Sequence, residues 1–277
     1  METGYDLNFQ KLRTVLMHRP GNEINIIDNP KKWLFLKKPS LAKMQKEHDS
    51  VADVLSSESV KIIELKKSFK DTPNIIFTRD LGAFLKNGFY KCCLKEDVRK
   101  KESSLIENFL DKEKVSVFGK ENKSTIEGGD IIFFDKGRIL VGQSRRTCKE
   151  GIENFKRYAD REIIKVPVPK KFIHLDLIFS ILSKDVCLIV PNTLPDDFIG
   201  FLNEENFTIL NAEESEAEKM AGNVFSLSEK KIVSHSAHKK TNKILKNYGF
   251  DVIEVDISEI LNGGGGINCI TLPILRS

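Results

Sequence analysis

Four short segments of the sequence combine residue types that could do chemistry. The most unusual is residues 263–269, where four consecutive glycines precede Ile, Asn and Cys. Because glycine has no Cβ, this backbone can adopt positive φ and approach a ligand closely. A cysteine directly after such a loop is a candidate nucleophile, since a thiolate in a polar, accessible setting is reactive. A flexible loop before a buried structural cysteine explains the segment equally well.

Two further segments place acids and a histidine close together. Glu127-Gly-Gly-Asp130 presents two carboxylates around a tight turn, which could bind a cation or orient a base, although a plain hairpin turn is the simpler interpretation. His174-Leu-Asp176 interrupts an apolar stretch, and its two polar side chains would share one face of a strand. Since an unpaired buried acid is costly, this pair indicates either a general acid/base or an Asp176 that caps a helix beginning at Leu177.

The fourth segment, residues 74–80, reads Asn-Ile-Ile-Phe-Thr-Arg-Asp and predicts a strand that runs into a charged tripeptide. Taken alone, Arg79 and Asp80 would be an ordinary surface ion pair. His235 and His238 have a spacing that some metal sites use, but no acid or cysteine stands near them in the sequence. We therefore expect these two histidines to face solvent, and we predict no metal site.

Short apolar runs alternate with amphipathic stretches, and these elements would have to position the four segments. The expected helices are residues 40–56, 98–110, 148–158, 196–203 and 236–248. The expected strands are residues 14–17, 60–65, 74–77, 89–94, 115–118, 131–134, 138–141, 163–166, 186–190, 207–210, 223–227, 231–233 and 251–255. Since no linker and no repeat is visible, this rhythm predicts an α/β fold in one domain over residues 1–277.

Composition excludes several classes of function. The chain has 277 residues, and its 44 Lys and Arg against 40 Asp and Glu give a net charge of only +4. This mild, dispersed charge argues against a nucleic-acid partner. No stretch is long and apolar enough for a membrane span, and no signal peptide is visible. Five cysteines without metal spacing or a disulfide framework predict free thiols and a cytoplasmic protein.

The order of the four segments resembles that of the guanidine-modifying enzymes of the pentein superfamily, and most closely that of the arginine deiminases. The likeness begins at residues 12–23, which read Leu-Arg-Thr-Val-Leu-Met-His-Arg-Pro-Gly-Asn-Glu, and ends at residues 269–276, which read Cys-Ile-Thr-Leu-Pro-Ile-Leu-Arg. The resemblance implies an α/β fold built as a five-bladed propeller of pseudo-fivefold ββαβ modules. It also implies catalysis without a metal or an organic cofactor.

The resemblance assigns roles to five of the residues above. Cys269 is implied as the nucleophile, His174 as the general acid/base and Glu127 as its acidic partner. Asp80 and Asp176 are implied as the groups that grip the guanidinium nitrogens. A planar cation rich in N–H donors suits such a ring of carboxylates, and a thiolate is strong enough to attack its central carbon.

Three more residues match the positions with which arginine deiminases hold the carboxylate of the amino acid. Asn74 stands six residues before Asp80, Arg99 matches the first family arginine, and Arg146 follows Glu127 by nineteen residues and matches the second. These matches count against agmatine, which has no carboxylate. The resemblance also implies a supporting group around the site, which consists of Asp130, Gly264, Gly265 and Gly266.

We therefore expect hydrolysis of L-arginine to L-citrulline and ammonia, with a small guanidino compound as the partner. Two departures leave the substrate and a homo-oligomeric state open. A helical insertion typical of arginine deiminases is absent, since only residues 66–73 connect Leu65 to Asn74. In addition, Gly264 replaces a family arginine. The alternatives are a dimethylarginine hydrolase, another guanidino or ureido hydrolase, and an amidinotransferase. A ribosome-binding factor with the pentein fold is the alternative without catalysis.

Overall fold

Three-stranded sheets carry the fold in the computed structural model, which describes residues 1–5, 7–66, 68–120 and 123–277. Within these residues the strands form five sheets, with the orders β15-β1-β2, β3-β4-β5, β6-β7-β8, β11-β10-β9 and β12-β13-β14. The helices are α1 (Leu41–Ser57), α2 (Glu102–Lys112), α3 (Lys149–Lys156), α4 (Asp196–Glu204), α5 (Lys239–Tyr248) and α6 (Ser258–Leu261). The architecture is therefore α/β, as the sequence predicted.

The strands are short and are distributed over the whole chain. They are β1 (Leu12–Met17), β2 (Lys61–Glu64), β3 (Gly82–Leu85), β4 (Gly88–Lys91), β5 (Val117–Phe118), β6 (Ile131–Phe133), β7 (Arg138–Gln143), β8 (Glu162–Pro167), β9 (Phe179–Ser183), β10 (Val186–Ile189), β11 (Thr208–Asn211), β12 (Phe225–Ser228), β13 (Lys231–His235), β14 (Asp251–Val255) and β15 (Leu272–Arg276).

One ββαβ unit recurs in each of these sheets. In β6-β7-β8 the first two strands form an antiparallel hairpin, and the third strand returns after α3 to pair parallel with β7. The same order of antiparallel pair, helix and parallel strand holds around α2, α4 and α5. The repeat was not visible in the sequence because the five units share their pattern of strand pairing and not their residue types.

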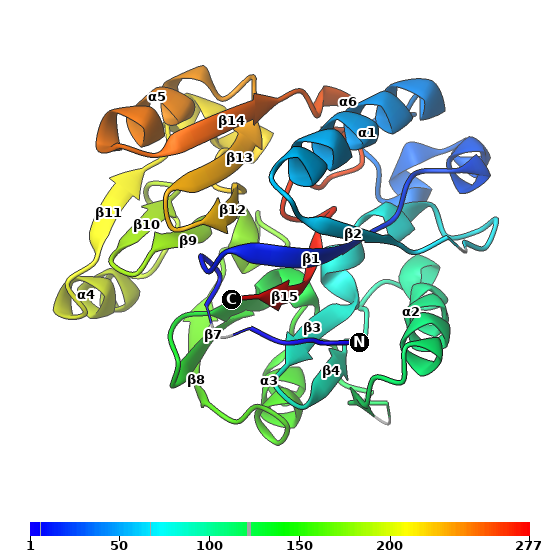
Figure 1. Ribbon diagram of the computed structural model, residues 1–277, viewed down its shortest axis with the longest axis horizontal. Coiled ribbons are helices and arrows are strands. Elements are labelled where there is room, and N and C mark those ends of the chain that lie inside the picture. The colour runs from blue at the N-terminus through cyan, green and yellow to red at the C-terminus, as the bar shows by residue number, and fades with distance from the viewer. Residues whose placement is uncertain (6, 67, 121–122) are drawn as a thin grey trace.

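The two ends of the chain together complete one such unit. Strand β15 pairs antiparallel with β1, and β1 pairs parallel with β2 after α1. Figure 1 shows β15 beside β1 in the middle of the molecule, with α1 to α5 towards the periphery. The register of this sheet therefore joins residues that are more than two hundred positions apart, such as Leu16 and Leu272.

The expected helices are confirmed within a few residues, but one expected strand is wrong. Residues 74–77 lie mostly in a 3-10 helix, Pro73–Ile76. Proline fixes φ and lacks an N–H, which suits the first turn of a helix. All four residues of this turn are buried, so a short apolar run could not distinguish it from a buried strand. Of the connection 66–73 before it, Lys67 lies outside the described residues.

The expectation that His235 and His238 face solvent is also wrong. Both are buried, with 2% and 1% of their surface exposed. His238 Nε2 lies 2.6 Å from the carbonyl oxygen of Lys219, and His235 Nδ1 lies 3.2 Å from that of Val255. Their partners come from other elements, which the local sequence does not reveal.

The sequence did not predict three of the strands, β3, β9 and β15, or the short helix α6.

Closure of the chain by β15 predicts a specific loss of stability. Ile274 is fully buried in this strand, whereas its neighbour Leu275 is only partly buried. We expect Ile274→Ala to lower the free energy of unfolding by ~2–5 kcal/mol, because it leaves a cavity in the sheet that joins the two chain ends. The measurement is urea unfolding, with Leu275→Ala as the matched control in the same strand. Equal losses in the two variants would contradict the interpretation.

Candidate active site

The sequence segments whose residue types could do chemistry meet at a cavity of about 450 Å³. Its polar lining comes from positions far apart in the sequence, namely Asn74, Asp80, Arg99, Arg146, His174 and Cys269, with Gly263, Gly264 and Gly265 beside them. Leu34, Phe172 and Met220 contribute to an apolar part of the wall. Glu127, Asp130 and Asp176 do not line this cavity. Glu127 contacts His174 and Arg146, which do line it, and Asp130 and Asp176 contact chain neighbours of lining residues.

The elements that place these groups share one position in the repeated unit. Asp80, Glu127 and Asp176 each lie in or directly before a 3-10 turn that leads into the first strand of a sheet, namely β3, β6 or β9. Asn223 and Cys269 lie a few residues before β12 and β15, the first strands of the other two sheets. The five units thus direct equivalent turns towards one site. The tight turn expected at residues 127–130 is confirmed as the 3-10 turn Gly128–Asp130, but it is not a hairpin turn, because β6 pairs with the following strand β7. A helix capped by Asp176 is not present, since Asp176 lies inside the turn Leu175–Leu177.

His174 and Glu127 form a buried pair at this site. His174 Nε2 lies 2.7 Å from Glu127 Oε2, and the two side chains are 1% and 0% exposed. Burial alone would lower the pKa of His174, but the carboxylates of Asp80 and Glu127 outweigh it and raise that pKa to about 10. Burial would raise the pKa of Glu127, but the bond to His174 and its charge hold it at about 2. At neutral pH the pair is therefore an imidazolium with a carboxylate.

Asp80 and Asp176 each present one carboxylate oxygen that has no hydrogen-bond partner within the described residues. The other oxygens are occupied, since Arg99 Nη1 donates to Asp80 Oδ2 at 2.5 Å and Asn268 Nδ2 donates to Asp176 Oδ2 at 2.7 Å. The two remaining atoms, Asp80 Oδ1 and Asp176 Oδ1, are buried, and Asp80 Oδ1 lies 3.6 Å from His174 Nδ1, which is an ion-pair distance and not a hydrogen bond. Burial raises the pKa of Asp176 to about 6. Two buried acceptors without donors are costly, so they are prepared for a ligand that supplies N–H groups.

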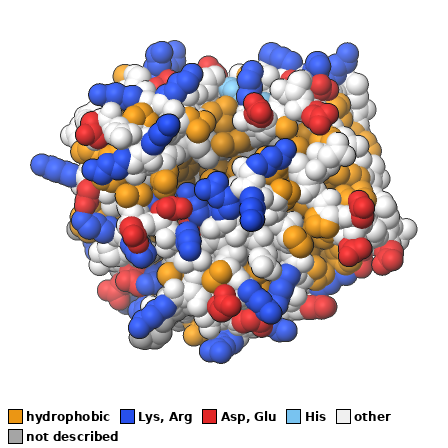
Figure 2. All heavy atoms as spheres, turned by 180° about the vertical axis from the view of Figure 1, so that it is seen from behind, with side chains coloured by type: hydrophobic (Ala, Val, Ile, Leu, Met, Phe, Trp, Pro, Cys, Tyr) orange, Lys and Arg blue, Asp and Glu red, His pale blue; other side chains and the backbone are white. Residues whose placement is uncertain are grey.

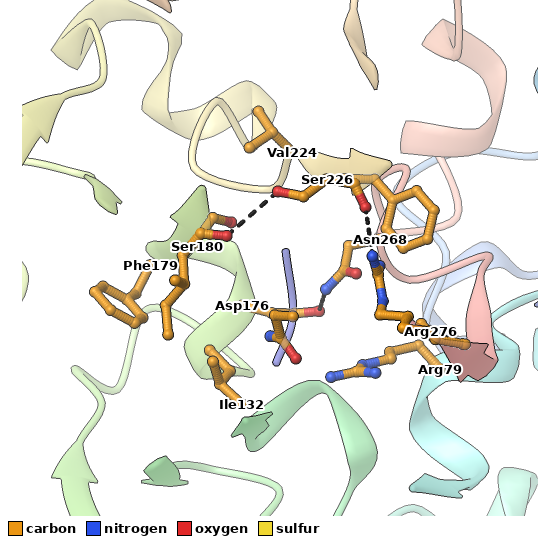
Figure 3. Close-up of a pocket in the computed structure, with 13 residues that line it drawn as sticks. Arg79, Ile132, Asp176, Phe179, Ser180, Val224, Ser226, Asn268 and Arg276 are labelled. Atoms are coloured by element: carbon orange, nitrogen blue, oxygen red, sulfur yellow. Dashed lines mark hydrogen bonds between the residues drawn. The ribbon is translucent and has the colours of Figure 1, made fainter. Parts of the chain in front are cut away.

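The expectation of a surface ion pair between Arg79 and Asp80 is wrong. Arg79 is 2% exposed, and it donates to the Tyr5 hydroxyl at 3.2 Å and to the Ile131 carbonyl at 2.6 Å. Figure 3 shows Arg79 on one side of a small polar pocket, near Asp176 and its bond to Asn268. Arg79 therefore supplies positive charge behind the carboxylates of the site and does not face solvent.

Cys269 lies beside the glycine loop and is almost fully buried, with 4% of its surface exposed. Asn223 Nδ2 lies 3.6 Å from its Sγ atom. A Cβ on Gly265 would stand 2.4 Å from the Phe77 ring, and one on Gly266 would stand 2.4 Å from Asn223 Oδ1. The loop therefore needs glycine for close packing, and Gly264 needs it for its φ of +84°.

The thiol of Cys269 is not ionised in this environment. Its burial, together with the nearby charges of Asp176 and Asp80, raises its pKa well above the ordinary value. A cation placed between these carboxylates would reverse the second effect, because it would offset the negative charge that opposes a thiolate. The site is thus arranged so that a cationic ligand would favour the reactive form of the cysteine.

The residues expected to hold a substrate carboxylate differ in how many hydrogen bonds and ion pairs they already make. Arg99 donates to Asp80, to Glu102 and to two backbone carbonyls, and it is 3% exposed. Asn74 Nδ2 donates to the Trp33 carbonyl at 3.0 Å. Arg146 has looser contacts, at 3.4 Å to both Glu96 and Glu127. Of the two arginines that line the cavity, Arg146 is therefore the one with more capacity for a new anion.

Two asparagines of the site were missed by sequence reasoning. Asn268 donates to Asp176, while Asn223 donates to the Asp176 carbonyl at 2.9 Å and accepts from the Asn268 N–H at 3.0 Å. Asn268 stands in the segment 263–269, where attention fell on the glycines and Cys269, and Asn223 belongs to none of the four segments. The position of Asn223 shortly before a first strand, equivalent to the turns that carry the acids, could have indicated it once the repeat was known.

A metal could find ligands at one place in the described residues. Asp80, Glu127 and His174 offer three ligand atoms within 4.8 Å of one another. The hydrogen bond between His174 and Glu127 already uses two of these groups, and a metal ligand must be a neutral imidazole. With the pKa of His174 raised to about 10, the arrangement fits an organic cation better than a metal ion.

Comparison with known proteins identifies the family to which this chain belongs. The family model described as N,N dimethylarginine dimethylhydrolase, eukaryotic, matches residues 25–276. The chain belongs to this family. It is accordingly a guanidine-modifying enzyme of the pentein superfamily, a hydrolase or amidinotransferase acting on guanidino C–N bonds, so the predicted superfamily is confirmed.

The chain also resembles one curated protein in sequence and several solved structures in fold. The uncharacterized protein YkgA of Bacillus subtilis (strain 168) is 29% identical over 231 residues, which cover 83% of this chain and 79% of YkgA. The N-terminal domain of ArgZ, an arginine dihydrolase from Cyanobacteria, superposes with a TM-score of 0.84 at 20% identity and covers 95% and 98% of the two chains. DDAH from Pseudomonas aeruginosa, complexed with citrulline, gives a TM-score of 0.77 at 20% identity, with 95% and 99% covered.

Figure 2 shows Lys and Arg side chains interspersed with Asp and Glu on one face of the molecule, as expected for a solvated surface. Among the described residues, no helix combines the length and the apolar character that a membrane crossing requires.

The ionised pair of His174 and Glu127 predicts a pH dependence of stability. The pKa of His174 is raised from 6.5 to about 10 in the folded state, so its contribution is fully present below about pH 6.5 and is lost as the pH rises through about 10. We expect the difference in unfolding free energy between wild type and His174→Gln to shrink across this window. Urea unfolding at pH 6, 8 and 10 measures it, and a difference that does not change with pH would refute the raised pKa.

Proposed function

We propose that this enzyme hydrolyses the guanidinium group of a free amino acid, converting L-arginine to L-citrulline and ammonia. The observation that supports it is the pair of buried acceptors without donors, Asp80 Oδ1 and Asp176 Oδ1, close to the thiol of Cys269 and the imidazolium of His174. A guanidinium offers planar N–H donors and a positive charge, which are the two properties that these carboxylates lack.

The proposed reaction begins when the substrate binds between the carboxylates. Its charge offsets those of Asp80 and Asp176, so the Cys269 thiol loses its proton to solvent and the thiolate forms a bond to the central guanidinium carbon. His174 then donates its proton to the departing nitrogen, and the C–N bond breaks to release ammonia. The product of this half is a thiouronium on Cys269, and His174 is neutral.

In the second half, neutral His174 accepts a proton from water, and the resulting hydroxide adds to the same carbon. The C–S bond then breaks to release the ureido product, and the proton of the added hydroxyl passes to the Cys269 thiolate. Throughout, Glu127 would hold the imidazole in orientation and stabilise its charged form. Apart from the proton that Cys269 releases to solvent, His174 and the attacking water account for the proton transfers of this proposal.

We also propose roles for the supporting parts of the molecule. The five ββαβ sheets would form a five-bladed propeller, and residues 1–277 would act as one catalytic domain. Arg146 and Arg99, with Asn74, would bind the carboxylate of the amino acid, and Gly264, Gly265 and Gly266 would allow the loop to close on the site. The five cysteines are free thiols, which fits a reducing, cytoplasmic setting.

A dimethylarginine hydrolase is the second candidate, and one observation favours it. The family model that matches residues 25–276 is the one for dimethylarginine dimethylhydrolase. The proposed chemistry would be the same, except that the leaving group would be dimethylamine instead of ammonia. The two candidates therefore differ only in which substituent the guanidinium carries.

Incubation with arginine, methylated arginines, agmatine and guanidinoacetate tests the proposal, with the ureido product and the released amine as readouts. Cys269→Ser is the matched variant, and we expect it to lose turnover while keeping the fold, because an alcohol ionises far less readily than a thiol. Acid-quenched wild type should show an adduct on Cys269 by mass spectrometry. Full activity of the serine variant would exclude the covalent route.

The contact with the substrate carboxylate predicts a change of specificity in Arg146→Ala. We expect kcat/KM for L-arginine to fall roughly a hundredfold, since the lost partner leaves a desolvated charge, while that for agmatine changes little. The measurement is the ratio of the two specificity constants. Arg145→Ala provides the control, because Arg145 is the neighbouring arginine and is exposed. A ratio that does not move would remove Arg146 from the proposed site.

A further inference from the structure

The carboxylate of Asp130 holds two separate parts of the site at once. It is fully buried, and its Oδ1 atom accepts the backbone N–H of Leu175 at 2.8 Å. Its Oδ2 atom accepts the hydroxyls of Ser144 and Thr147, both at 2.6 Å. Leu175 directly follows His174, so Oδ1 of Asp130 fixes the turn that carries His174. Oδ2 of Asp130 contacts a second turn, which contains Ser144 and Thr147.

The second turn is the one that carries Arg146. The Ser144 hydroxyl accepts the N–H groups of Arg146 at 3.0 Å and of Thr147 at 3.1 Å. The Thr147 hydroxyl accepts the backbone N–H of Glu127 at 3.1 Å. Each hydroxyl therefore donates to Asp130 and accepts the backbone N–H of a proposed functional residue, Arg146 for Ser144 and Glu127 for Thr147. These contacts fix the direction of both O–H bonds.

The packing around Asp130 leaves no room for adjustment. A Cβ on Gly142 would stand 2.4 Å from Asp130 Oδ1 and 2.8 Å from Leu175 Cβ. A Cβ on Gly129 would stand 2.7 Å from His174 Nδ1. The two glycines allow the turn of Asp130 to lie directly against the turn of His174, so displacement of the carboxylate would be felt by the imidazole.

We propose that Ser144 and Thr147, through Asp130, are positioning residues that couple the Arg146 turn to the His174 turn. The inference rests on the proposed function, in which Arg146 holds the substrate carboxylate and His174 transfers the proton. The coupling ties the correct placement of the amino-acid end of the substrate to the placement of the acid at its guanidinium end. Neither hydroxyl lines the cavity, so both act only through their partners.

The same contacts link the two hydroxyls to the charge of His174. Burial raises the pKa of Asp130 to about 7, while the bonds from Ser144 and Thr147 lower it. The ionised form of Asp130 in turn raises the pKa of His174. Loss of one hydroxyl should therefore make Asp130 more often neutral near pH 7, and the pKa of His174 should fall.

Thr147→Val tests this coupling, because valine has nearly the shape of threonine and carries a methyl group in place of the hydroxyl. Thr147→Ser is the matched control that restores the hydroxyl. The titration of His174 is followed by NMR of ¹⁵N-labelled histidine, with His174→Ala used to assign the signal. We expect Thr147→Val to lower the midpoint by about half a pH unit or more and kcat for L-arginine by about tenfold. Thr147→Ser should keep both values near those of wild type.

Ser144→Ala separates the Arg146 side of the coupling. We expect it to raise KM for L-arginine several-fold, and to have no further effect in an Arg146→Ala background, because the contact it positions is then gone. Equal behaviour of Thr147→Val and Thr147→Ser, or an undiminished effect of Ser144→Ala in that background, would overturn the inference. A shifted His174 titration in an enzyme that accepts no guanidino compound would support the coupling and refute the proposed function instead.

Discussion

The neutralisation of buried carboxylates is the constraint on which the rest of this structure depends. Asp80, Glu127, Asp130 and Asp176 are each almost completely removed from solvent and lie around the imidazole of His174. Charges in such a place are tolerated only when they are paired and hydrogen-bonded. The chain meets most of this requirement with the imidazolium of His174 and with buried arginines, and it leaves two oxygens without donors. Because these two carboxylate oxygens still lack hydrogen-bond donors, the site selects a cationic N–H donor as its ligand.

The repeated ββαβ unit explains how so many polar groups can converge. Each unit places the turn before its first strand towards the site, and these turns carry Asp80, Glu127, His174, Asn223 and Cys269. The side chain carried by such a turn can differ from unit to unit without disturbing the sheet behind it. The sheets remain apolar and rigid, and the chemistry is confined to one position of each unit.

Glycine at a few of these turns is required by distance more than by flexibility. A Cβ on Gly128 would stand 2.0 Å from the Arg79 carbonyl oxygen, so the turns that carry Glu127 and Asp80 are in direct backbone contact. The same holds where Gly265 meets Phe77. Close contact excludes water from the carboxylates, and exclusion of water is what shifts the pKa values of Asp176 and Cys269 upwards.

The sequence by itself determined the α/β class, the five long helices and the order of the segments that form the site, because these depend on local periodicity and on motifs of a few residues. It did not determine residues 74–77, the burial of Arg79 or that of His235 and His238, since their partners come from distant elements. Only the tertiary structure decided that His174 is charged and that Cys269 is a neutral thiol. A pKa depends on burial and on charges within a few ångströms, and those neighbours, Glu127 and Asp176, stand 47 and 93 positions away in the chain.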